Sequence, residues 1–127
     1  MEVGAQVWYS DPATNGDEVW ILAVVTASDV NEICVAPVEG KGALVRSRCK
    51  DGSYNGVEFA NSTATEGPDN LIALPHLNEP CMLNEIQCRF HLNQIYTFTG
   101  PVLIAINPFQ NLPSLYTKVS YSYKLVI

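Results

Sequence analysis

The first 60 residues alternate short runs of β-branched and aromatic residues with clusters of turn-forming residues. Short strands at intervals of about 8–12 residues are typical of a small antiparallel barrel, because closure hides edges that a flat sheet would expose. In one run, 43–48, neither face is cleanly apolar, which predicts an edge strand. The predicted strands cover 5–9, 18–27, 33–36, 43–48 and 57–59.

An SH3-like barrel fits a segment of this size. Barrels of this kind often bind proline-rich peptides through aromatic grooves, and Trp8, Tyr9 and Trp20 are the candidates for such a groove. The alternative places Trp20 in the core and Trp8 at a sheet edge or against a neighbouring domain. We favour the alternative, because the first long loop has no cluster of acidic residues beside paired tyrosines, which peptide-binding barrels usually carry there.

Charge divides the chain near residue 70. Residues 1–70 hold 11 acidic and 4 basic residues, whereas residues 71–127 hold 2 and 3. The stretch 61–69 is rich in Ser, Thr, Gly and Pro, which is typical of a linker. We therefore predict a barrel at 1–60, a linker at 61–70 and a second segment at 71–127. An uncharged run at 90–117 predicts a surface that another part of a protein covers.

The overall charge and hydropathy exclude two classes of partner. A net charge of −6 argues against nucleic acid, whose binding needs clustered Lys and Arg. The longest apolar stretch, 19–25, is far shorter than the ~20 residues that span a bilayer. The first seven residues have no basic region, so we expect no secretory signal.

The second segment begins with helical signals. Asp69 or Asn70 is a candidate cap for a short turn at 71–74, and Asn78 is a natural N-cap for a helix at about 79–90. The spacing of Leu83, Ile86 and Phe90 predicts that these three form its buried face.

A β-hairpin is predicted next. Its arms are 95–99 and 102–106, joined by Gly100-Pro101. The second arm is continuously apolar, which predicts burial on both faces, and Asn107-Pro108 ends it.

The cysteines indicate no metal centre. Without a secretory signal, reduced thiols are favoured over disulfides, and no pair has the CxxC spacing of a zinc knuckle. Metal or redox chemistry is a third hypothesis for function, with Cys34, Cys49, Cys81, Cys88, His76 and His91 as its residues.

Five segments of the second part carry a family resemblance through their order and spacing: 74–80, 89–90, 95–100, 103–109 and 112–116. With them, the sequence from Leu71 onward closely resembles the start of the myosin motor domain. Through Val7-Trp8, Asp11-Pro12 and the Trp20 strand, the first part resembles the SH3-like barrel that many myosins carry before the motor. The resemblance implies a mixed α+β fold, in which the SH3-like antiparallel barrel precedes a helix and a β-hairpin from the start of a P-loop-type motor.

The resemblance also implies function. A complete motor of this family is an ATP-driven, actin-based machine of the cytoplasm and its actin cytoskeleton, with ATP and Mg²⁺ as its cofactors. The residues at the adenine pocket would be Asn107, Pro108, Phe109 and Tyr116. The alternative is that Phe109 and Tyr116 pack under their loop.

Departures from the family limit this prediction. The chain has no GxxxxGK[ST] phosphate loop and neither switch. We therefore expect no catalytic residue, no metal ligand, no tight cofactor binding and no ATP hydrolysis by the 127 residues alone, with the rest of a motor and actin as partners. We also expect self-association. The competing hypothesis is a non-enzymatic adaptor built on the barrel, with 71–127 as an appendage.

Overall fold

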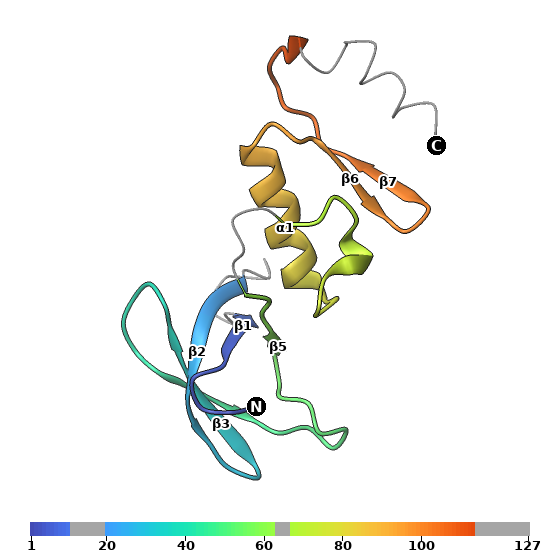
Figure 1. Ribbon diagram of the computed structural model, residues 1–127. Helices are drawn as coiled ribbons and strands as arrows, with labels where there is room; N and C mark the ends of the chain where they lie inside the picture. Colours follow the sequence, from blue (N-terminus) through green and yellow to red (C-terminus); the bar gives the residue numbers. More distant parts are fainter. Residues whose placement is uncertain (11–19, 63–66, 114–127) are drawn as a thin grey trace. The chain divides into compact units, whose positions relative to one another are not determined.

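The computed structural model describes residues 1–10, 20–62 and 67–113 (Figure 1). The chain divides into two compact units, Met1–Ser62 and Thr63–Ile127. The fold is mixed α+β: an SH3-like antiparallel half-barrel, one α-helix and a β-hairpin. None of the helices in the described ranges is long and apolar enough to pass through a membrane.

The first unit is a five-stranded antiparallel sheet, whose strand order is β4-β3-β2-β1-β5. β1 pairs on both sides, so that Val7 lies opposite Ala23 of β2 and opposite Phe59 of β5. The predicted strands are confirmed over the described residues, and residues 18 and 19 of the predicted strand 18–27 lie outside them. As predicted, β4 lies at a sheet edge. The strands are β1 (Gln6–Ser10), β2 (Trp20–Ser28), β3 (Glu32–Pro37), β4 (Leu44–Ser47) and β5 (Val57–Phe59).

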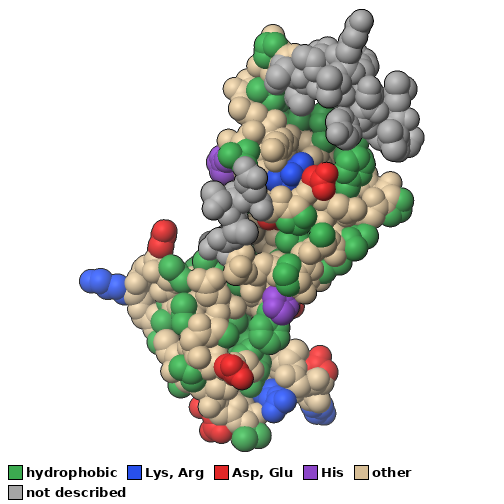
Figure 2. Space-filling view, in the orientation of Figure 1, with side chains coloured by type: hydrophobic (Ala, Val, Ile, Leu, Met, Phe, Trp, Pro, Cys, Tyr) green, Lys and Arg blue, Asp and Glu red, His purple; other side chains and the backbone are tan. Residues whose placement is uncertain are grey.

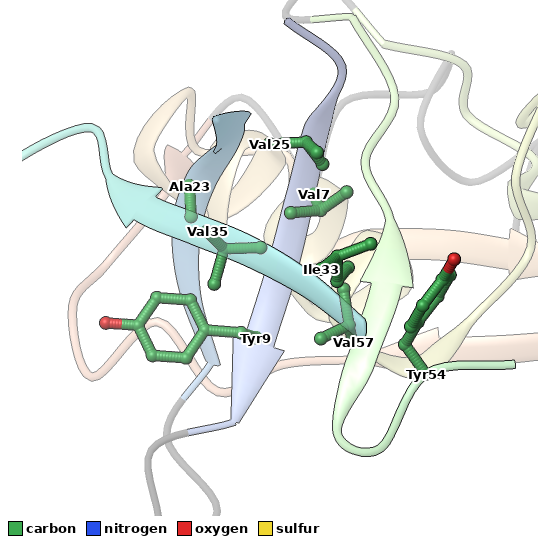
Figure 3. Packing of buried hydrophobic residues seen from close by; sticks show 8 residues of the cluster. All are labelled: Val7, Tyr9, Ala23, Val25, Ile33, Val35, Tyr54 and Val57. Carbon is green, nitrogen blue, oxygen red and sulfur yellow. The ribbon is translucent and has the colours of Figure 1, made fainter. Parts of the chain in front are cut away.

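The core of this unit follows the alternation of the strands. Every second residue points inward, as in the pair Ala23 and Val25 of β2, and Figure 3 shows these side chains gathered between the strands. Trp20 is only half-buried, and because side chains alternate along β2 it lies on the face opposite to Ala23 and Val25. The prediction that Trp20 lies in the core is therefore wrong. The buried cluster is Val7, Tyr9, Ala23, Val25, Ile33, Val35, Tyr54 and Val57.

In the second unit a short 3-10 turn, η1 (Leu71–Ala73), precedes α1 (Glu79–His91). Asn70 caps η1 and Asn78 caps α1, where its side chain accepts a hydrogen bond from the Cys81 N–H at 3.0 Å. The hairpin of β6 (Tyr96–Thr99) and β7 (Val102–Ala105) follows. The predicted helix and hairpin are confirmed, and α1 ends one residue later than predicted.

The buried face of α1 differs from the prediction. Leu83 is 52% exposed, whereas Cys81 and Glu85 are buried. The reason lies in Arg89, whose Nε donates to Thr97 Oγ1 at 3.0 Å and whose Nη2 donates to the Tyr96 carbonyl at 2.8 Å. Residues 81, 85 and 89 share one face of the helix, because residues four apart lie on one side of it, and on this face Arg89 contacts β6 and Glu85 contacts Gly67.

The second hairpin strand is also more open than predicted. Val102 is 56% exposed, and Leu103 and Ile104 are half-buried. Within the described ranges β7 pairs with β6 on one side, so its apolar side chains meet no second sheet. The space-filling view also shows hydrophobic side chains at the surface (Figure 2).

Candidate functional site

The segment that follows β7 is held at its base by the hairpin. The Ile106 N–H donates to the Ile95 carbonyl at 2.9 Å. The Asn107 side chain then accepts a hydrogen bond from the Phe109 N–H at 2.8 Å, across Pro108. This is an Asx turn, in which an asparagine side chain replaces a backbone acceptor. Pro108 fixes φ at the centre of the turn.

Phe109 takes an unusual conformation at the end of this turn. Its φ is +52°, and its side chain is 89% exposed. The left-handed region disfavours residues with a Cβ, so the Asn107 hydrogen bond helps to hold a backbone that the ring itself does not stabilise. The alternative that Phe109 packs under the loop is therefore wrong. Tyr116, the fourth predicted pocket residue, lies outside the described residues.

A second contact ties the segment to α1. Gln110 Nε2 donates to Asn93 Oδ1 at 3.2 Å. Asn93 has φ of +59° and ends the helix, because its N–H donates to the Phe90 carbonyl and the Gln94 N–H to the Arg89 carbonyl. This pair of bonds is a Schellman motif, whose left-handed position favours Gly and then Asn. We did not predict Asn93 as a site residue, although an asparagine just past the end of a predicted helix was a usable signal.

The loop offers a specific set of groups to a flat aromatic ligand. Asn107 Oδ1 already accepts a hydrogen bond from the backbone, so the group of this amide that can bind a ligand is its Nδ2 donor. The exposed Phe109 ring presents a face for stacking. These groups fit the edge and the face of a purine. No group of three or more His, Cys, Asp or Glu side chains placed to hold a metal ion occurs among the described residues.

Comparison with known proteins identifies the family of this segment. Residues 68–124 match the model of the myosin head (motor domain). The chain carries a segment of the myosin head.

Plant myosins are similar to almost the whole chain. Myosin-8 of Arabidopsis thaliana is 36% identical over 115 residues, which are 91% of this chain and 7% of that protein. Myosin-5 of the same plant is 36% identical over 125 residues, or 96% of this chain and 7% of that protein. The chain thus spans about 7% of the length of these relatives, and its matched part is an N-terminal portion of the myosin head.

The three aromatic residues predicted to form a groove, Trp8, Tyr9 and Trp20, lie on two different faces of the sheet in the first unit. Tyr9 is buried in the core, and the guanidinium of Arg46 lies 6.0 Å from the centre of its ring. Trp8 lies opposite Leu22 and Trp20 opposite Ser10, so both tryptophans share the other face as diagonal neighbours. A groove of all three aromatic residues is therefore wrong, and a pair of half-buried tryptophans remains.

The cysteines are free thiols divided between the two units. In the first unit Cys34 is half-buried and Cys49 is exposed; in the myosin head segment Cys81 is buried and Cys88 is exposed.

Proposed function

We propose that this chain forms the N-terminal part of an ATP-driven actin motor and contributes one wall of the adenine pocket. The observation that carries the proposal is the turn at Asn107, which presents an amide donor and an exposed phenyl ring within a myosin head segment. In the complete motor the partners are actin filaments and the remaining motor chain, in the cytoplasm on the actin cytoskeleton, and the cofactor is ATP with Mg²⁺.

Four residues have distinct roles in this proposal. Asn107 Nδ2 donates to a ring nitrogen of adenine, and Pro108 fixes the loop that presents the amide. Phe109 supplies an apolar surface for the base. Tyr116, which lies outside the described residues, is the fourth pocket residue that the family resemblance implies.

The chain by itself is not an ATPase in this proposal. Catalysis of phosphoryl transfer rests on groups that cradle the phosphates and hold the metal, and the sequence contains no GxxxxGK[ST] loop. Adenine contacts without phosphate contacts leave little free energy after the cost of association. We therefore expect a dissociation constant weaker than about 1 mM, which corresponds to roughly −4 kcal/mol.

The test compares ATP with adenosine, using ligand-observed NMR on the full 127-residue chain. We expect similar, weak binding of both, because the phosphates meet no cradle, and loss of most of the signal in Asn107→Ala. Asn111→Ala, which changes an exposed amide four residues away, is the matched control. Micromolar ATP binding or Mg²⁺-dependent phosphate release would contradict the proposal, and so would undiminished binding by Asn107→Ala.

A second candidate function is a peptide-binding adaptor. The observation in its favour is the pair Trp8 and Trp20, which share one face of the sheet and are half-buried. Binding on a peptide array that Trp8→Ala removes, while circular dichroism stays native, would support this function. Val38→Ala is the control, because it truncates an exposed side chain in the loop after β3. No binding by the native chain would exclude the adaptor.

A further inference from the structure

A hollow of about 300 Å³ opens in the second unit beside the C-terminal half of α1. None of its described lining residues belongs to the Asn107–Phe109 turn. Three lining residues carry charge: Asp69, Glu85 and Arg89. Cys88 and Leu92 add a thiol and an apolar wall. The volume is at the small end of the range for ligand sites.

Glu85 is the unusual member of this lining. It is 9% exposed, and its Oε1 is buried without a hydrogen-bond partner in the described part of the chain. Its carboxyl group lies against the backbone of Gly67, where an added Cβ would overlap it. The absence of a side chain at Gly67 is thus what admits the carboxyl group to this position.

The neighbouring cation does not supply the missing donor. Arg89 directs Nε to Thr97 and Nη2 to the Tyr96 carbonyl, so these two donors are engaged by β6. With Asp69 and Glu85 ionised, the charged groups of the lining sum to −1. A buried carboxylate oxygen without a donor is costly, and a charged donor compensates such an oxygen better than a neutral one.

We propose that this hollow binds the cationic end of an alkylamine or alkylguanidine, whose N–H donates to Glu85 Oε1. The negative lining selects a cation, and Leu92, the apolar side chain of the lining, offers a surface on which a methylene stem can pack. The site stands apart from the adenine pocket and holds whether or not the chain is part of a motor.

The test uses Cys88 as a reporter, because its thiol is exposed and lines the hollow. The full chain is alkylated at micromolar concentration with iodoacetamide, and mass spectrometry follows each cysteine separately. The probes are ethylammonium, ethylguanidinium, neutral ethylurea and NaCl at matched ionic strength. The two cations distinguish an amine from a guanidine as the preferred group. Cys49, exposed in the first unit, is the internal control.

We expect a saturating cation to slow the alkylation of Cys88 at least threefold, with the rate at Cys49 unchanged and ethylurea inactive. Glu85→Gln should raise the cation concentration that gives half of this slowing at least fivefold. Glu79→Gln, which changes an exposed carboxylate on the same helix, should leave that concentration unchanged. A saturable acceleration that Glu85→Gln abolishes would equally support a cation beside the thiol. No saturable effect, an equal effect of ethylurea, or an undiminished effect in folded Glu85→Gln would overturn the proposal. If Glu85→Gln fails to fold, the contrast between cation and ethylurea in the native chain decides.

Discussion

Asparagine side chains direct the backbone at three turning points of the second unit. Asn70 Oδ1 accepts from the N–H groups of Ile72 and Gly100, each at 3.2 Å, and so joins η1 to the turn of the hairpin. Asn78 begins α1, and Asn107 forms the turn that presents Phe109. All three use the same property, a short side chain that accepts hydrogen bonds from nearby backbone.

The Arg89–Thr97 hydrogen bond makes a residue-scale prediction. Thr97 is 1% exposed, and Thr97→Val removes the acceptor of Arg89 Nε while preserving the shape of the side chain. We expect the free energy of unfolding of this unit to fall by about 1–3 kcal/mol, because a charged donor is left unsatisfied in a partly buried position. Amide hydrogen exchange of β6 and β7 measures the loss. Thr99→Val, in the same strand but half-buried, is the control, and equal losses in both variants would contradict this account.

Asp51 gives a prediction about pH. The Ser53 side chain and backbone N–H both donate to this exposed carboxylate, and these bonds hold the pKa of Asp51 below its ordinary value. A lowered folded-state pKa stabilises the turn above the unfolded-state pKa, and this contribution is lost as the pH falls through the folded-state pKa. Ser53→Ala should raise the pKa of Asp51 toward its ordinary value in an NMR titration, whereas Ser28→Ala should leave it unchanged. An unchanged pKa in Ser53→Ala would show that another group causes the shift.

At the scale of elements, local sequence signals predicted which helices and strands form. Contacts between residues far apart in the sequence decided which face of each element is buried. The start of α1 was predictable, because Asn78 and the residues it caps are neighbours in the sequence. The buried face was not, since the Arg89 bonds to Tyr96 and Thr97 depend on how the chain folds back after the helix. The same distinction holds for the sites. The turn at Asn107 and Pro108 is local and was predictable from the sequence, whereas the hollow at Glu85 was not, because residues on either side of α1 line it.

The stability of the first unit should depend strongly on Ile33, which is fully buried in the cluster. Ile33→Ala should lower the free energy of unfolding by about 2–5 kcal/mol, because the truncated side chain leaves a cavity among closely packed neighbours. Urea unfolding followed by tryptophan fluorescence reports on this unit, which contains both Trp8 and Trp20. Val45→Ala, an exposed position on β4, should cost less than about 0.5 kcal/mol. Similar costs for both variants would contradict the packing described for this core.

At the scale of the whole molecule, both units expose large apolar side chains to water, although the first also buries a cluster of eight residues. Those exposed in the first unit are Val3, Val30, Val38, Leu44, Val45 and Phe59. Those exposed in the second are Ile72, Leu77, Leu83, Leu92, Val102 and Phe109. A chain with such a surface is expected to associate with itself or with a covering partner.

Self-association should depend on β7, whose apolar strand has β6 on one side in the described residues. Val102→Lys should lower the sedimentation-average mass of the 127-residue chain, because a lysine on an edge strand opposes pairing between sheets. Val38→Lys adds the same charge to an exposed position of the first unit and should leave the mass unchanged. A native chain that is monomeric at high concentration would contradict this prediction, as would equal effects of the two variants.

The central position of β1 has a consequence for synthesis. β1 is made before both of its partners. β2 follows about ten residues later, whereas β5 (Val57–Phe59), which pairs with the other edge of β1, follows much later. A nascent chain that stops before Val57 therefore carries β1 as an open edge, with Val7 and Tyr9 lacking the Val57 side of their cluster. A chain that terminates before β5 should therefore aggregate rather than form a smaller folded unit. A chain that is still being made needs its open edge protected, for example by a chaperone, until β5 is complete.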